Sequence, residues 1–137
     1  MTAVVRHRTP DSGVQSHVVP TILCIDDHQP TLQTLSWLFE SHGYTCLSSS
    51  SARTALQLFR DNPVDLVVLD HTLETDDGTA LAGTLKNLRS VPILMLSGRA
   101  DLKKPDGVDV LLIKPQEPRV LLGTVLSLLV RGQSKSD

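Results

Sequence analysis

Two hydrophobic periodicities alternate along most of the sequence. Short runs of β-branched and leucine residues predict buried strands, and these runs are Thr21–Ile25, Thr45–Ser48, Leu66–Leu69, Ile93–Leu96 and Val110–Ile113. Apolar residues at helical spacing predict helices between and after them, and these segments are Pro30–Ser41, Ser51–Asp61, Gly78–Leu88 and Pro118–Val130. Most strand runs are apolar at successive positions, which is typical of parallel sheets covered on both faces. The pattern therefore predicts a doubly wound α/β domain with a five-stranded parallel sheet.

The length of the chain favours one globular domain with short extensions. Its 137 residues suit a single domain, and 40% apolar with 20% charged residues is typical of a folded protein. Residues 1–20 lack periodicity and predict a flexible leader, whereas residues 21–130 carry the predicted domain. The polar residues 131–137 predict a flexible tail.

Composition argues against several classes of function. The 13 Lys and Arg against 15 Asp and Glu leave no basic field for direct nucleic-acid binding. No segment approaches the roughly 20 apolar residues of a membrane span, and no secretory signal is evident. Cys24 and Cys46 lie in strand-like runs without a CxxC motif, which predicts buried free thiols. We therefore expect a cytoplasmic protein without nucleic-acid or membrane partners.

Polar side chains follow four of the predicted strands. Asp26 and Asp27 come after the first strand and Asp70 after the third. Ser97 follows the fourth strand and Lys114 the fifth. Because the carboxyl ends of parallel strands meet at one edge of such a sheet, we expect these side chains to share one crevice.

Three neighbouring carboxylates require compensation for their mutual repulsion. Two carboxylates about 4 Å apart repel by roughly 4 kcal/mol at an effective dielectric near 20. A hard divalent cation, the Lys114 ammonium or protonation of one carboxylate can offset this repulsion. Oxygen ligands without cysteine favour Mg²⁺ over zinc. With the cation bound, Asp70 could attack a phosphorus centre, while Ser97 and Lys114 stabilise the phosphoryl oxygens.

Four motifs around these residues resemble the receiver domain of two-component response regulators. They are ILCIDDHQP, DLVVLDHTL, PILMLSG and VLLIKP, in this order, and the resemblance covers about residues 20–130. It implies the flavodoxin-like strand order 2-1-3-4-5. It also implies that Asp70 accepts phosphate from a histidine kinase or a phosphotransfer protein. Asp27, Asp70 and the backbone carbonyl of Thr72 would ligate Mg²⁺, with Asp26 acting mostly through water.

The resemblance implies a signalling switch rather than an enzyme. Ser97 and Lys114 would bind the phosphoryl group, and Gly78 matches the glycine that the family carries before its third helix. The chain would be a single-domain response regulator, a monomer or weak dimer, that binds an unknown downstream protein when phosphorylated. Its only chemistry would be to gain and lose its own phosphate.

Three features depart from the family pattern. Glu74 stands where the family commonly has a proline, and Leu111 stands where it usually has the aromatic residue that turns inward on activation. The segment between the fourth and fifth strands is short and contains Pro105 and Gly107, so we expect a short or missing fourth helix.

Structural alternatives exist for the chosen residues. Asp26 or Asp27 could be an N-cap for the helix that begins near Pro30. Ser97 could belong to an ordinary turn and Lys114 to a solvated loop. His28 and His71, which flank the acidic residues, could indicate a transition-metal site.

Two other functions remain open at this stage. The first is a receiver-like protein-interaction module that works without phosphorylation, which Leu111 and the short segment after the fourth strand would suit. The second is a metal-dependent phosphatase for an external substrate, for which His71 is the one evident general acid.

Overall fold

A computed structural model of the chain describes residues 19–73 and 76–135. The predicted leader, apart from Val19 and Pro20, lies outside the described residues, as does Glu74. In chain order the elements are β1 (Thr21–Ile25), α1 (Gln29–Ser41), β2 (Thr45–Ser49), α2 (Ala52–Asp61), β3 (Leu66–Asp70), α3 (Gly78–Leu88), β4 (Ile93–Ser97), β5 (Val110–Ile113) and α4 (Pro118–Lys135).

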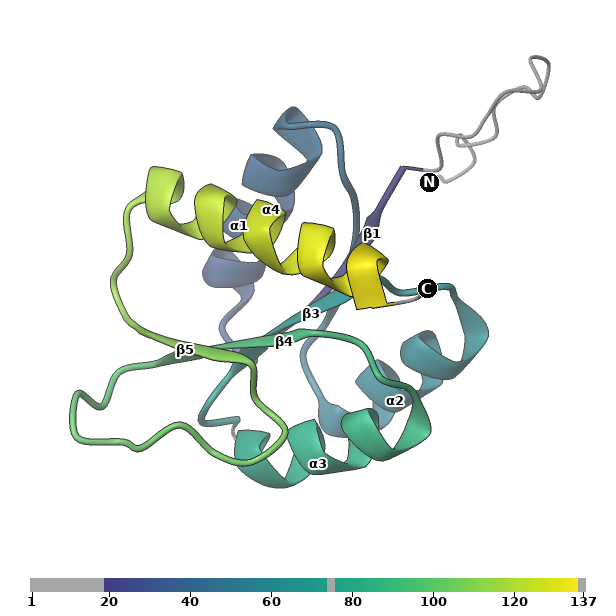
Figure 1. Ribbon diagram of the computed structural model, residues 1–137. Coiled ribbons are helices and arrows are strands. Elements are labelled where there is room, and N and C mark those ends of the chain that lie inside the picture. The colour runs from purple at the N-terminus through teal and green to yellow at the C-terminus, as the bar shows by residue number, and fades with distance from the viewer. Residues whose placement is uncertain (1–18, 74–75, 136–137) are drawn as a thin grey trace, which may run out of the picture.

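The strands form one parallel sheet in the order β2-β1-β3-β4-β5, which confirms the predicted fold. Figure 1 shows α1 and α4 on one face of this sheet and α2 and α3 on the other. The central strands β1, β3 and β4 are buried along their whole length, whereas the edge strands β2 and β5 are partly exposed. The central strands are apolar on both sides because helices cover both faces.

Alternate residues of the strands supply two separate cores. Val68 packs with Phe39 of α1 in the core beneath α1 and α4. The preceding residue, Val67, packs with Phe59 of α2 in the core beneath α2 and α3. This alternation follows from the two-residue period of a strand. Because both faces of the sheet are packed against helices, the ends of the strands are held in place.

Local signals set several helix boundaries at or next to the residues where the sequence predicted them. The Ser51 hydroxyl accepts a hydrogen bond from the Thr54 backbone N–H at 3.2 Å and caps α2. Gly43 follows α1 with a φ of +90°, a left-handed conformation that favours glycine. Pro118 is the first residue of α4, where its missing N–H costs no hydrogen bond.

The connection from β4 to β5 contains no helix among its described residues 98–109, which confirms that the fourth helix of the family pattern is missing. Val108 closes this connection by packing into the core beneath α2 and α3. The Asp109 carboxylate then accepts hydrogen bonds from the Ile93 backbone N–H at 2.8 Å and from Lys86 Nζ at 2.7 Å. These contacts fix the start of β5 without a helix.

The last helix extends beyond its predicted end. α4 continues to Lys135 rather than stopping at Val130, so the predicted end of this helix was wrong. The flexible tail expected for residues 131–137 stays a prediction. This last part of α4 lies against the body of the domain, because a Cβ at Gly132 would be 3.6 Å from Cγ of Pro92. Even so, no helix within the described ranges is both long enough and apolar enough to cross a bilayer.

The two cysteines lie side by side on neighbouring strands. Both are free, as predicted, and their Sγ atoms are 3.5 Å apart. Cys24 is buried, but Cys46 is only partly buried, so the expectation of two buried thiols was wrong for Cys46. The difference arises because β2 is an edge strand, which the sequence of β2 alone does not reveal.

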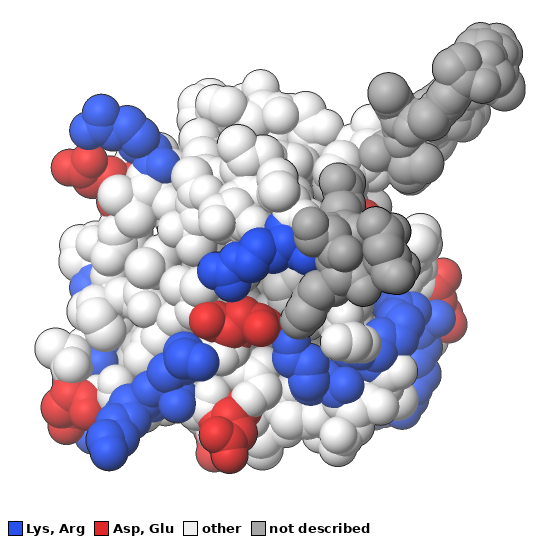
Figure 2. Space-filling model, in the orientation of Figure 1, with Lys and Arg blue, Asp and Glu red and all other residues white. Residues whose placement is uncertain are grey.

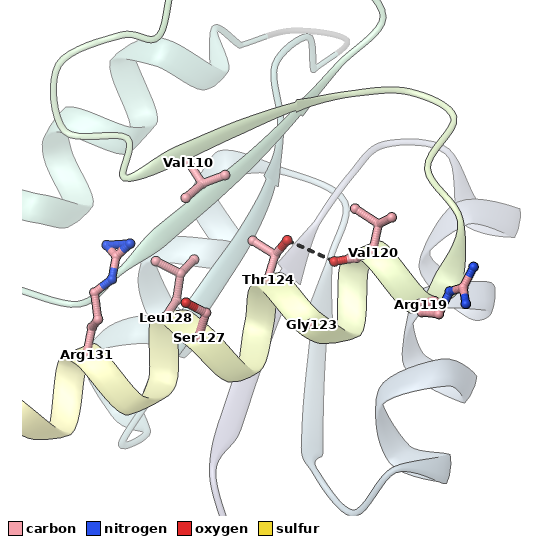
Figure 3. Close-up of a pocket in the computed structure, with 8 residues that line it drawn as sticks. All are labelled: Val110, Arg119, Val120, Gly123, Thr124, Ser127, Leu128 and Arg131. Carbon is pink, nitrogen blue, oxygen red and sulfur yellow. Dashed lines mark hydrogen bonds between the residues drawn. The ribbon is translucent and has the colours of Figure 1, made fainter.

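The described surface has mixed charge, and a groove lies beside α4. Figure 2 shows Lys and Arg side chains interspersed with Asp and Glu side chains on the face in view. A groove runs between β5 and α4 (Figure 3), and it is lined by Val110, Arg119, Val120, Gly123, Thr124, Ser127, Leu128 and Arg131. None of the acidic residues predicted for the functional site lines this groove.

Candidate functional site

The carboxyl ends of β1 and β3 bring three aspartates together. Asp26 and Asp27 follow β1, and Asp70 is the last residue of β3. One carboxylate oxygen from each aspartate lies within 4.8 Å of the other two. Asp26 and Asp70 are only 2% and 8% exposed, whereas Asp27 is partly exposed. The cluster therefore opens to solvent on the side of Asp27.

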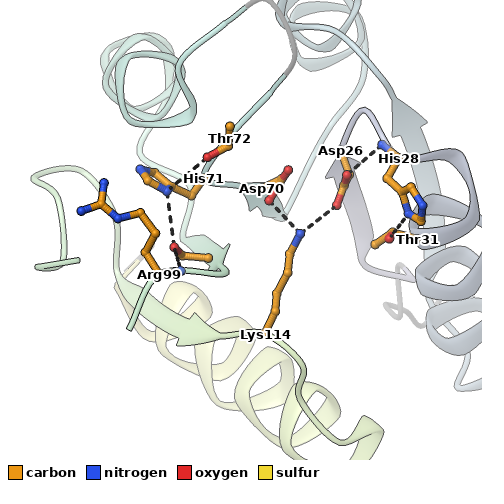
Figure 4. A network of polar contacts seen from close by, with 9 residues as sticks. Asp26, His28, Thr31, Asp70, His71, Thr72, Arg99 and Lys114 are labelled. Atoms are coloured by element: carbon orange, nitrogen blue, oxygen red, sulfur yellow. Dashed lines mark hydrogen bonds and ion pairs between the residues drawn. The ribbon is translucent and has the colours of Figure 1, made fainter. Parts of the chain in front are cut away.

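Lys114 reaches this acidic cluster from the end of β5 (Figure 4). Its Nζ lies 2.9 Å from Asp70 Oδ1 and 3.7 Å from Asp26 Oδ2. Partial burial by itself lowers the pKa of Lys114, but the hydrogen bond and charge of Asp70, aided by Asp26, outweigh burial and raise this pKa above its usual value. Lys114 is therefore a cation that offsets one of the three carboxylate charges.

The remaining negative charge is energetically unfavourable. Burial raises the pKa of Asp26 above its ordinary value, and the charges of Asp70 and Asp27 act in the same direction, against the His28 backbone hydrogen bond and Lys114. Two carboxylate charges separated by 4.8 Å repel by roughly 3 kcal/mol at an effective dielectric near 20. Mg²⁺ prefers hard oxygen donors and usually takes one or two carboxylates together with water molecules, so the three neighbouring aspartates fit this cation.

The aspartates after β1 do not cap the next helix. The N-cap residue of α1 is His28, whose side chain caps no backbone N–H, so the alternative of an Asp26 or Asp27 cap was wrong. Instead, Asp26 Oδ1 accepts a hydrogen bond from the His28 backbone N–H at 2.9 Å. This bond holds the Asp26 carboxylate over the end of β1 rather than in the first turn of α1.

Ser97 ends β4, and both its hydroxyl and its backbone carbonyl have polar partners. It is completely buried, and its Oγ accepts a hydrogen bond from the Arg99 backbone N–H at 2.9 Å. Its Oγ also lies 3.3 Å from His71 Nδ1. The Lys114 backbone N–H donates to the Ser97 carbonyl at 2.8 Å, which ties the ends of β4 and β5 together. Ser97 therefore lies at the end of β4, between elements that carry other predicted site residues.

Gly78 explains why α3 can begin so close to the site. Its N–H donates to the His71 carbonyl at 3.0 Å. A Cβ at this position would collide with the carbonyl oxygens of Asp70 and His71. The neighbouring residues Thr72 and Asp77 pair as an isolated antiparallel bridge, which closes the loop between β3 and α3. Only glycine lets the helix approach the end of β3 without displacing the backbone.

The two histidines beside the site have different neighbours. His28 is exposed, and its Nδ1 lies 2.7 Å from Thr31 Oγ1. His71 is partly buried beside Ser97, a contact that the sequence analysis did not predict. Among the described residues, the group of potential metal ligands contains aspartates and no histidine, which argues against the transition-metal alternative.

The position of the family's usual aromatic residue is filled by an aliphatic side chain. Leu111 is partly buried against the core beneath α2 and α3. In the register of the sheet it pairs with Met95 of β4. A leucine at this position lacks the large flat ring and the polar tip of the aromatic residue it replaces.

The sequence matches the family of response regulator receiver domains over residues 22–125. The chain belongs to this family. It is therefore a receiver domain of the two-component type, with the parallel sheet and order of strands that such domains share. The transcriptional regulatory protein TorR of the TorCAD operon in Escherichia coli O157:H7 is 30% identical over 115 residues, which are 80% of this chain and 50% of TorR. The chain spans about half the length of the curated relatives it matches.

Solved structures share the fold of this receiver domain. The signal receiver domain of an HD domain-containing protein from Pseudomonas fluorescens Pf-5 has a TM-score of 0.83 and 27% identity, over 91% of this chain and 97% of the other. The response regulator TrrA from Thermotoga maritima, solved with Mg²⁺ and BeF, has a TM-score of 0.75. Its identity is 22%, over 80% of this chain and 99% of TrrA, so this likeness supports the fold alone.

Proposed function

We propose that this receiver domain is a Mg²⁺-dependent switch in which Asp70 accepts a phosphoryl group. The observation that carries the proposal is the contact of Lys114 Nζ with Asp70 at 2.9 Å, beside two further aspartates whose carboxylates face the same point. Phosphoryl transfer requires a protein mainly to position the reacting groups and to neutralise negative charge. An ammonium group and cation-binding carboxylates beside one acceptor carboxylate can do both.

Each residue of the site has a role in this proposal. Asp27, Asp70 and the backbone carbonyl of Thr72 hold Mg²⁺, and Asp26 acts mostly through a water molecule. The cation, when bound, would neutralise negative charge on the phosphoryl oxygens during transfer. Lys114 pairs with one phosphoryl oxygen.

Ser97 completes the site by donating a hydrogen bond to a phosphoryl oxygen. An oxygen of Asp70 attacks phosphorus and forms the new O–P bond, while the N–P bond of a phosphohistidine donor breaks. The electron pair of that bond returns to the donor imidazole. The reaction produces an aspartyl phosphate.

The partners in this proposal are a histidine kinase or phosphotransfer protein upstream and a second protein downstream. The family match supports the first, because histidine kinases and phosphotransfer proteins are what receiver domains interact with. Signalling as a single domain, a monomeric or weakly dimeric state and a cytoplasmic location stay predictions. So does the absence of direct nucleic-acid contact, for which the net charge of −2 and the mixed surface in Figure 2 are the support.

Beryllofluoride, a mimic of the phosphoryl group, provides the first test. We expect it to perturb the amide NMR signals of residues around Asp70 when Mg²⁺ is present and to leave them unchanged when Mg²⁺ is removed with EDTA. Asp70→Asn, which preserves the size of the side chain, should not respond. A wild type that ignores the mimic in saturating Mg²⁺ would refute the proposal.

A second candidate function is an interaction module that works without phosphorylation. The missing helix between β4 and β5 and the aliphatic Leu111 favour it, because both lie where the family transmits its signal. In that case wild type and Asp70→Asn should capture the same partner proteins to the same extent. Under the phosphorylation-dependent proposal, capture should increase after wild type is treated with a phosphodonor, and Asp70→Asn should show no increase.

A further inference from the structure

The Ser97 hydroxyl has two protein partners in this structure, and one of them is a side chain. The Arg99 backbone N–H donates to Ser97 Oγ at 2.9 Å, and His71 Nδ1 lies 3.3 Å from the same oxygen. When Nδ1 carries no proton, the Ser97 hydroxyl can donate its single hydrogen to it. Ser97 is 0% exposed, so water does not readily replace these partners.

The register of the sheet sets His71 and Ser97 apart from Asp70. Leu69 and Met95 are paired across β3 and β4 and lie in the core beneath α2 and α3. The two-residue period places Ser97 on that same face of the sheet and Asp70, the residue after Leu69, on the opposite face. His71 follows the end of β3 and lies beside Ser97. Because the Ser97 hydroxyl has a single hydrogen, it must turn this hydrogen away from His71 Nδ1 in order to donate it to a phosphoryl oxygen on Asp70.

The position of His71 is well fixed by its backbone. Its N–H donates to the Leu96 carbonyl at 2.8 Å, and its carbonyl accepts from the Gly78 N–H at 3.0 Å. The Thr72 hydroxyl lies 3.5 Å from His71 Nδ1. Figure 4 shows the His71 ring turned away from Asp70 and toward Thr72 and Arg99. A side chain held in this way can favour one orientation of its neighbour.

We infer that His71 is a positioning residue that holds the Ser97 hydroxyl in its resting orientation and so weakens the response of the site to a phosphoryl group. This inference rests on the proposed function. A neutral hydrogen bond between side chains contributes about 1 kcal/mol, which is equivalent to about a fivefold change in an equilibrium constant. Removing the His71 side chain should therefore make the phosphorylated arrangement easier to reach.

The test is a double-mutant cycle on the full chain with beryllofluoride at saturating Mg²⁺. We expect His71→Ala to lower the half-saturating concentration of beryllofluoride about fivefold, because the resting contact is lost. In the Ser97→Ala background the same change should have no effect, since there is no hydroxyl to hold. His71→Asn, whose amide can replace the imidazole nitrogen as a partner for Ser97, should restore the wild-type value.

His28 provides a matched control. It also follows an aspartate of the site, but its Nδ1 contacts Thr31 rather than Ser97, so His28→Ala should show no coupling to Ser97. An unchanged or weaker response of His71→Ala, or an equal shift in the Ser97→Ala background, would overturn the inference while leaving the proposed function intact. A wild type that does not bind beryllofluoride would instead overturn the proposed function, and this inference with it.

Discussion

At the scale of single residues, Asp26 combines a charge with a buried position. Its side chain is 2% exposed and lies near two other carboxylates, with Lys114 Nζ 3.7 Å away. Burial and neighbouring negative charge both disfavour its ionised form, which is why its pKa is raised. A site arranged in this way is less stable without a cation than with one.

This position leads to a prediction about stability without metal. Asp26→Asn should increase the free energy of unfolding at neutral pH in EDTA, because it removes a charge that burial and the neighbouring carboxylates of Asp70 and Asp27 disfavour. Urea denaturation measures this quantity. Added Mg²⁺ should reduce the difference by stabilising wild type more than the variant. Asp101→Asn, which removes an exposed carboxylate paired with Arg99, should hardly change stability.

The difference in stability between wild type and Asp26→Asn should depend on pH in a defined direction. Because the folded protein holds the Asp26 proton more tightly than the unfolded chain, wild type gains stability as the pH falls through the raised pKa toward the ordinary value of 3.8. The advantage of Asp26→Asn should therefore be largest above the raised pKa and shrink at lower pH. An advantage that grows on acidification would contradict the raised pKa.

At the scale of elements, hydrophobic pattern predicts most boundaries but not solvent exposure. The strands β1, β3 and β4 are recognisable because they are apolar at successive positions, and Gly43 and Ser51 mark helix ends by their chemistry. The prediction that Cys46 is buried was wrong, because the exposure of this residue depends on the position of β2 at the edge of the sheet. The last part of α4 lies beside Pro92, which is distant from Gly132 in the sequence, so the pattern of α4 alone did not predict where this helix ends.

The start of α3 offers a prediction at this scale. Gly78→Ala should lower the free energy of unfolding by roughly 1–3 kcal/mol, because its Cβ would overlap backbone carbonyls that have little room to move. Gly83→Ala in the same helix is the matched control, since a Cβ there meets no atom within 4 Å. That substitution should stabilise the protein by up to about 1 kcal/mol through helix propensity.

Gly78→Ala and Gly83→Ala should also differ in their effect on the functional site. We expect Gly78→Ala also to weaken beryllofluoride binding, because the displaced carbonyls belong to Asp70 and His71. Equal stability of the two alanine variants in thermal unfolding would contradict the close approach of α3 to β3.

At the scale of the whole molecule, the topology of the sheet determines where the chemistry lies. Parallel strands with matching directions bring Asp26, Asp70 and Lys114 to one edge, and this placement could be predicted from the order of motifs alone. The contact between His71 and Ser97 could not, since it requires the register of β3 and β4. Counting residues from Leu69 and Met95, once paired, is the signal that would have found it.

The proposed switch depends on phosphorylation of Asp70 in a reaction that requires Mg²⁺. The most direct measurement is intact-protein mass spectrometry after incubation with acetyl phosphate and Mg²⁺, followed by peptide mapping of the modified residue. We predict one added phosphoryl group, located on Asp70, that is absent in EDTA and absent from Asp70→Asn. The proposal would be contradicted if wild type gained no phosphoryl group. It would also be contradicted if wild type and Asp70→Asn were both phosphorylated at another residue.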